Sequence, residues 1–222
     1  MDEKERQNLH KELGMFFLRT PETSDPFLQL FGSTLRSIAC NQLNMATVES
    51  FEQPDLESIA ILNLSEGKRV ASLGLFEASS HHMATGLHFL GEDITSNERR
   101  CLYMDLCEGM ISANFLIGEY GVVESYADKV KGVASFEESL KTQNIYLKAL
   151  SMAGKYFDCV AKGFDLLRKL GVSIPEDVSD EDTVTILTRM RQFLSTYETD
   201  QLIRYCEKQI DESDRIVLRI VE

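Results

Sequence analysis

The sequence contains histidines, cysteines and glycine–lysine pairs, the residue types that bind metals, act as nucleophiles and hold phosphates. Three histidines, His81, His82 and His88, fall within eight residues. On a helix, adjacent side chains point about 100° apart, so only His81 and His88 share a face and no third ligand lies close enough for a metal site. Met83 follows the pair, where a phospho-accepting histidine needs an acidic neighbour. We therefore predict that one histidine of the pair is packed and the other exposed, with no bound metal.

The cysteines predict buried, reduced thiols and not a disulfide framework. They are odd in number, form no Cys-x-x-Cys pair, and lie inside apolar periodic segments. Their positions are Cys40, Cys101, Cys107, Cys159 and Cys206. Reduced thiols of this kind are typical of a cytoplasmic protein.

No nucleotide, cofactor or calcium site is expected. A phosphate-binding loop needs Gly-x-x-x-x-Gly-Lys followed by Ser or Thr. The strings Gly67-Lys68-Arg69 and Gly154-Lys155-Tyr156 lack both the hydroxyl and the preceding glycine. The acidic stretch 176–182 lacks the alternating ligands and the central glycine of a calcium loop. With no catalytic constellation elsewhere, we predict that the chain is not an enzyme.

Composition excludes two classes of partner. The 222 residues carry a formal net charge of −13, which disfavours binding to phosphate backbones or anionic lipids. No stretch approaches 18 consecutive apolar residues, and the charged start of the chain has no signal-peptide core. We therefore expect a cytoplasmic protein that binds neither nucleic acid nor membrane.

The elements that must position these residues are helices throughout. Apolar residues recur at helical spacing, and no alternating pattern bounded by hairpin turns predicts a strand. The predicted helices cover residues 2–19, 26–43, 76–90, 97–117, 120–131, 135–152, 156–170, 184–197 and 201–210. Another, the third in chain order, begins near residue 55. The first helix is expected to bury Leu9, Leu13, Phe16 and Phe17, and the third Ile59, Ile61, Leu62 and Leu64.

A repeat in the turns predicts how these helices are arranged. The pattern Gly-x-aromatic occurs three times, each time between two consecutive predicted helices. Seventeen residues after the first and the third of these glycines, another glycine ends the second helix of the pair. The positions are Gly74 with Phe76, Gly118 with Tyr120, Gly154 with Tyr156, and the helix-ending Gly91 and Gly171. Glycine permits a tight turn, and the aromatic is expected to pack between the two helices that it joins. Spacings of 44 and 36 residues between the first three glycines are close to tetratricopeptide length.

The fold class expected is therefore all-α, a tetratricopeptide-like stack of antiparallel helix pairs forming one domain over residues 1–222. Residues 1–50 form a leading pair, residues 55–178 the tetratricopeptide-like pairs, and residues 183–222 divergent helices. A generic helical bundle is the alternative.

Five segments resemble, in order, a region of large signalling ATPases. Residues 5–14 resemble an RxxLHxxIG helix, and residues 41–44 resemble the helix end hxLN. Residues 58–71 resemble xLAxLNLxAGxKA, residues 76–90 resemble AYxxALxYxxxGLxLL, and residues 167–175 resemble LxxLGIxLP. This order is similar to the tetratricopeptide-like region that follows the AAA/STAND-type ATPase in multidomain serine/threonine and hybrid histidine kinases. His81 and His82 depart from the pattern, and no phosphate-binding loop occurs in the chain.

The resemblance implies a non-catalytic segment that holds protein partners or relays a signal to adjacent ATPase or kinase domains. The alternative is a stand-alone tetratricopeptide adaptor unrelated to any ATPase. The two differ in whether the reading frame upstream of Met1 encodes a phosphate-binding ATPase.

Overall fold

The computed structural model describes residues 2–19, 26–91, 94, 96–172 and 188, and within these ranges every regular element is a helix and none is a strand. The helices are α1 (Glu3–Arg19), α2 (Pro26–Leu43), α3 (Gln53–Ser72), α4 (Phe76–Leu90), α5 (Asn97–Ile117), α6 (Tyr120–Val133), α7 (Phe136–Met152) and α8 (Tyr156–Lys169), with a short 3-10 turn η1 (Val48–Ser50). The all-α prediction is confirmed. Within the described residues, no helix has the length and hydropathy needed to cross a bilayer.

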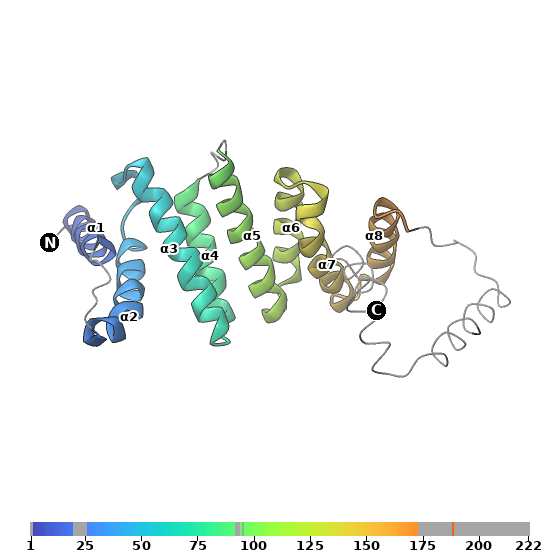
Figure 1. Cartoon of the computed structure of the whole chain (residues 1–222), viewed down its shortest axis with the longest axis horizontal. Coiled ribbons are helices and arrows are strands. Elements are labelled where there is room, and N and C mark those ends of the chain that lie inside the picture. The colour runs from blue at the N-terminus through green and yellow to red at the C-terminus, as the bar shows by residue number, and fades with distance from the viewer. Residues whose placement is uncertain (1, 20–25, 92–93, 95, 173–187, 189–222) are drawn as a thin grey trace. The chain divides into compact units, whose positions relative to one another are not determined.

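The chain divides into two compact units, Met1–Ala149 and Leu150–Glu222. In the first unit, helices α1 to α6 pack on neighbours in sequence: α1 on α2, α3 on α4, α4 on α5, and α5 on α6 (Figure 1). Helix α3 also contacts α2 and α5. The described part of the second unit is the end of α7, helix α8 and the turns beside it. The helices predicted at 184–197 and 201–210 lie outside the described residues.

Local sequence signals account for the helix ends. The predicted ranges 76–90 and 97–117 coincide with α4 and α5. The Ser96 hydroxyl accepts a hydrogen bond from the Arg99 amide at 3.2 Å and so caps α5. Ser135 and Glu138 form a reciprocal capping box at the start of α7, with bonds of 3.3 and 2.8 Å.

Two apolar clusters hold the first unit together. One joins α1, α2, α3 and the end of α4, and the other joins α3, α4 and α5. The first contains Met15, Ala39, Cys40, Leu43, Ala46, Phe51, Ile59, Leu62 and Phe89; the second contains Ala60, Leu64, Met83, Leu90, Leu102, Leu106 and Met110. Helix α4 contributes to both clusters and therefore couples the two halves of the unit.

The buried face of α1 differs from the prediction. Leu9, Leu13 and Phe16 are exposed, whereas Gly14 and Met15 are buried. Gly14 decides this orientation, because a Cβ there would lie 2.5 Å from Leu43 Cγ, so α2 can approach only along the glycine. The same kind of error affects α3, in which Ile61 is 52% exposed while Ile59, Leu62 and Leu64 are buried.

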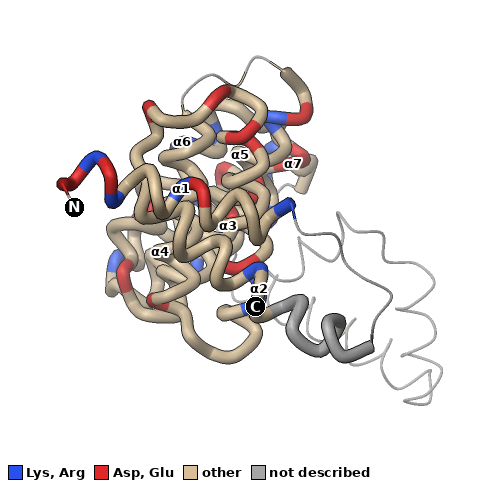
Figure 2. The backbone as a smooth tube through the Cα atoms, turned by 90° about the vertical axis from the view of Figure 1, so that its left-hand side faces the viewer, with Lys and Arg blue, Asp and Glu red and all other residues tan. Residues whose placement is uncertain are grey.

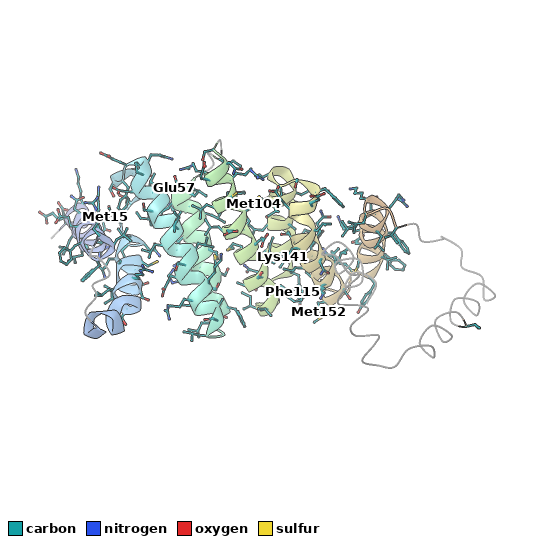
Figure 3. The ribbon with its side chains drawn as sticks, viewed as in Figure 1. Met15, Glu57, Met104, Phe115, Lys141 and Met152 are labelled. Carbon is teal, nitrogen blue, oxygen red and sulfur yellow. The ribbon has the colours of Figure 1, made fainter. Side chains whose placement is uncertain are left out.

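The methionines fill the core only in part. Met15 and Met104 are buried within the first unit, but Met152, at the end of α7, is 66% exposed (Figure 3).

Candidate functional site

The turns between helices are built on the glycines that the repeat pattern singles out. Gly74, Gly91, Gly118, Gly154 and Gly171 all have positive φ, from 71° to 85°. At Gly118, the amide of Glu119 donates to the Asn114 carbonyl at 2.9 Å, and the glycine amide donates to the Phe115 carbonyl at 3.3 Å. This is a Schellman motif, which satisfies the last carbonyls of the helix. The turns at Gly74, Gly154 and Gly171 have the same pair of bonds.

The aromatic that follows each glycine does not have a uniform role. Phe76 is half-buried and lines a cleft. Tyr120 lies 6.2 Å, centroid to centroid, from Phe115 of the preceding helix. Tyr156, by contrast, is 64% exposed. Three residues after these aromatics, Ser79 and Val123 are buried, which lets the helix backbones approach, whereas Cys159 is only half-buried.

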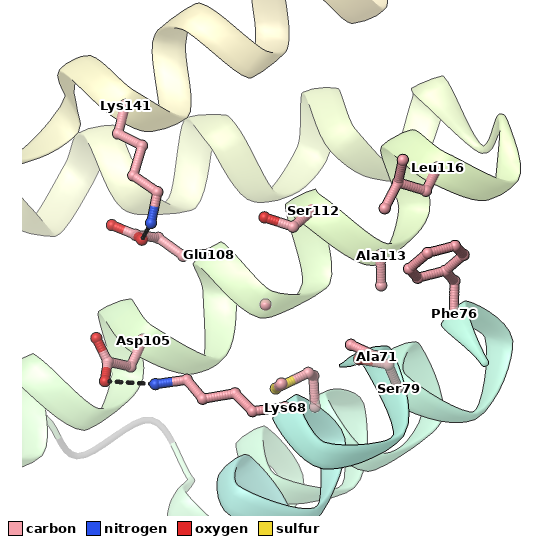
Figure 4. A pocket seen from close by; sticks show the side chains of 12 residues that line it. Lys68, Ala71, Phe76, Ser79, Asp105, Glu108, Ser112, Ala113, Leu116 and Lys141 are labelled. Atoms are coloured by element: carbon pink, nitrogen blue, oxygen red, sulfur yellow. Dashed lines mark hydrogen bonds and ion pairs between the residues drawn. The ribbon is translucent and has the colours of Figure 1, made fainter. Parts of the chain in front are cut away.

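The candidate binding site is a cleft of about 310 Å³ in the first unit, formed by α3, α4, α5 and the start of α7 (Figure 4). Its volume is at the lower end of the range for ligand sites. The lining residues are Lys68, Ala71, Phe76, Ser79, Met83, Asp105, Glu108, Gly109, Ser112, Ala113, Leu116 and Lys141. Half of them come from one face of α5, at the spacing i, i+3, i+4, i+7, i+8 and i+11.

Met83 forms the floor of the cleft and is held between two glycines. It is only 1% exposed. A Cβ on Gly67 of α3 would lie 2.7 Å from Met83 Cε, and a Cβ on Gly109 of α5 would lie 2.5 Å from Met83 Sδ. The methionine of α4 therefore occupies space that only glycines on α3 and α5 leave open.

One end of the cleft carries charges of both signs. Lys68 of α3 pairs with Asp105 of α5 at 3.4 Å, and Lys141 of α7 pairs with Glu108 of α5 at 2.7 Å (Figure 4). Both lysine side chains are highly exposed, at 60% and 69%, whereas that of Glu108 is 24% exposed. The Lys68–Asp105 pair is exposed on both sides and is worth about 0–1 kcal/mol, so an incoming charged group can replace Lys68 at little cost. In the second pair only the lysine is highly exposed.

The opposite end of the cleft is apolar. Phe76 of α4 faces Ala113 and Leu116 of α5 there, as Figure 4 shows. Leu116 is 56% exposed, although a leucine gains free energy when buried. Between the two ends, Gly109 and Ser112 keep the wall of α5 low. The cleft thus offers a charged end, a shallow middle and an apolar end in line.

A second constellation, the Asn63 cluster, lies buried where α2, α3 and α4 meet. It comprises Cys40, Asn44, Asn63 and His82. The Asn63 Oδ1 lies 2.9 Å from Asn44 Nδ2, 3.4 Å from Cys40 Sγ and 3.2 Å from His82 Nδ1. Asn63 in turn donates to Asn44 Oδ1 at 2.9 Å and to the Ile59 carbonyl at 3.0 Å. One amide therefore ties three helices together.

Electrostatics in this cluster favour uncharged groups. Burial raises the pKa of the Cys40 thiol to about 12, with Glu66 adding to the rise. Burial also lowers the pKa of His82 below its ordinary 6.5, against the opposing effect of Glu66. The pKa of Glu66 is itself lowered, chiefly by its hydrogen bond from Arg69. A protonated thiol is a poor nucleophile. The hydrogen bonds of this cluster join α2, α3 and α4.

The remaining predicted chemical groups lie apart from the cleft. His81 is exposed and His82 buried, as predicted for the pair. Cys40 and Cys107 are buried as expected. Contrary to the prediction, Cys101 is exposed and Cys159 is only half-buried, and Cys206 lies outside the described residues. Among the described residues, no three histidine, cysteine or acidic side chains are grouped to hold a metal ion.

Comparison of the chain with protein-family models, with curated proteins and with solved structures finds no match.

The sequence interpretation missed both the cleft and the Asn63 cluster. Gly109 lies inside a helix and not at a turn, so the sequence gives no reason for a glycine there; the reason is the contact with Met83 of α4. The signal for Asn63 was a polar residue within the apolar run 59–64, which indicates a buried amide that needs partners.

Proposed function

We propose that this chain is a non-catalytic protein-interaction segment that receives a short stretch of a partner protein in the cleft of α3, α4, α5 and α7. The observation that carries the proposal is the cleft itself, in which an exposed apolar end and exchangeable ion pairs lie on one continuous face of α5. Exposed apolar surface rimmed by polar groups is typical of binding sites for proteins.

The size of the cleft favours an extended segment over a helix. A helix with its side chains is about 10–12 Å across, so a cleft of about 310 Å³ would accept some of its side chains and not the whole helix. An extended segment, by contrast, fits with its side chains pointing alternately to the two walls.

The finer fold assignment belongs to the same proposal. We infer a tetratricopeptide-like stack of antiparallel helix pairs, supported by the Schellman turns at Gly74, Gly118 and Gly154 and by the packing of α3 on α4 and α5 on α6. The relation to signalling ATPases, in which the segment would relay a signal to adjacent ATPase or kinase domains, stays a prediction of the sequence. An upstream reading frame that encodes a phosphate-binding ATPase would support it, whereas a stop codon and promoter there would favour the stand-alone adaptor.

The cleft is tested by selecting peptides from a random display library on the intact chain. We expect selected peptides to lose binding when Ser112→Tyr fills the middle of the cleft or Leu116→Ser removes its apolar end. Leu73→Ser is the matched control, because Leu73 is 62% exposed but lies in the α3–α4 turn, outside the cleft. Far-UV circular dichroism checks that each variant is folded.

Two results would overturn the proposal. One is that no peptide is enriched on the wild-type chain. The other is that enriched peptides bind the two cleft variants as well as they bind wild type and the Leu73→Ser control.

A further inference from the structure

We propose that the partner segment is cationic: a basic side chain, best an arginine, binds Asp105 and Glu108, and an apolar side chain about four residues away binds beside Phe76 and Leu116. This inference rests on the proposed function and specifies its ligand. It follows from the order of groups along α5 and from the charge of the unit around them.

The geometry of α5 sets the spacing. Glu108 and Leu116 are eight residues apart, which at 1.5 Å per residue is about 12 Å along the helix. An extended peptide advances about 3.3 Å per residue, so about four residues span the same distance. Gly109 and Ser112 of α5 lie between these points, and neither has a large side chain that would block the peptide backbone.

The ion pairs at the charged end of the cleft indicate the sign of the charge that the partner segment carries. Asp105 and Glu108 are short side chains on one helix, one turn apart, and Glu108 is largely covered. Lys68 and Lys141 reach them from α3 and α7 on long, exposed stems that can swing into solvent. Glu108, whose side chain is 24% exposed, is therefore held in place more firmly than Asp105, at 55%, and both lysines have longer side chains that can move away. A guanidinium is the better replacement, because it donates two parallel hydrogen bonds to a carboxylate.

The surrounding charge acts in the same direction. Residues 1–149 carry 22 Asp and Glu against 13 Lys and Arg, a net charge of −9. Figure 2 shows acidic positions spread over several helices of this unit, with basic ones between them. A negative unit attracts cationic segments from a distance and repels anionic ones. An acidic peptide would have to overcome this field.

The test uses three pools of labelled, extended peptides that are identical except at one fixed position. Each pool has randomised neutral residues around a fixed leucine, and the fourth position before it is arginine, glutamine or glutamate. We expect the arginine pool to bind the intact chain at least tenfold more tightly than the glutamate pool. Its affinity should fall as salt rises, because screening weakens the attraction.

Matched variants separate this inference from the proposed function. Asp105→Asn with Glu108→Gln should remove most of the preference for arginine over glutamine. Asp128→Asn with Glu98→Gln makes the same change of charge at exposed positions outside the cleft and should retain it. Equal affinity for all pools, or a preference for glutamate, overturns the cationic partner but leaves a peptide-binding cleft, provided that Leu116→Ser still abolishes binding. If no pool binds and the display selection also fails, the proposed function falls with it.

Discussion

Replacing Asn63 with alanine should destabilise the first unit more than any comparable loss of a polar side chain. Asn63 is fully buried and bonds to residues on α2, α3 and α4. Its removal leaves the ring N–H of His82 without its amide partner in a buried site, at about 1–3 kcal/mol. The half-buried Asn44 amide, which water can reach in part, adds roughly 0.5–1.5 kcal/mol, and the small cavity adds about 1 kcal/mol.

Alanine is the better helix former by about 0.7 kcal/mol, which offsets part of this loss. The expected net destabilisation is about 3 kcal/mol. Asn114→Ala provides the comparison, because Asn114 is also buried in a helix but bonds only to Ser80 Oγ at 2.9 Å and to the Met110 carbonyl of its own helix at 2.7 Å. Its loss leaves the half-buried Ser80 hydroxyl accessible to water, so about 1–2 kcal/mol is expected.

Urea unfolding of the intact variants, followed by circular dichroism, gives both free energies of unfolding. Amide hydrogen exchange should place the loss in α2, α3 and α4. A loss below about 1 kcal/mol for Asn63→Ala, or one no larger than that for Asn114→Ala, would refute the view that this amide joins three helices.

Three further outcomes follow from the turns and the buried groups. Gly118→Ala should lower the free energy of unfolding by about 1–2 kcal/mol, because φ there is 85°, whereas Gly121→Ala, in open space on α6, should be neutral or stabilising in the same urea experiment. Stability should fall as the pH drops below about 6.5, because His82 is protonated more readily in the unfolded chain than in the folded one. In thermal melts at several pH values, His82→Gln should lack this part of the pH dependence, whereas substitution of the exposed histidine beside it should retain it. A thiol-specific reagent should label the exposed Cys101 in the folded chain and reach Cys40, whose pKa is about 12, only after unfolding; rapid labelling of Cys40 would contradict its burial.

Sequence patterns alone located most helices and their ends. Glycines before aromatic residues, Pro26 and the Ser96 and Ser135 caps act on their own local backbone, so their effect can be predicted without knowing what packs nearby. The predicted ranges 76–90 and 97–117 agree with α4 and α5 for this reason. The charge of −13 is likewise a property of composition.

Which face of each helix is buried depended on tertiary contacts. The three apolar residues Leu9, Leu13 and Phe16 outweigh Gly14 in any count of hydrophobic residues, yet α2 packs on Gly14 because only there can the backbones come close. In the same way, Gly67 of α3 and Gly109 of α5 leave the space that Met83 of α4 occupies. Hydrophobic periodicity shows which residues of a helix are apolar, but not where a neighbouring helix has room to approach.

The residues of the cleft likewise could not be identified from the sequence alone. Its residues come from four helices between positions 68 and 141, and no short motif joins them. Local sequence determined the helices and the turns, because those depend on backbone geometry and nearest neighbours. Only the packing of α3, α4, α5 and α7 decided that Lys68, Asp105, Glu108 and Lys141 meet at one end of a cleft and Phe76 and Leu116 at the other, because long-range contacts set the distances between side chains that are far apart in the chain.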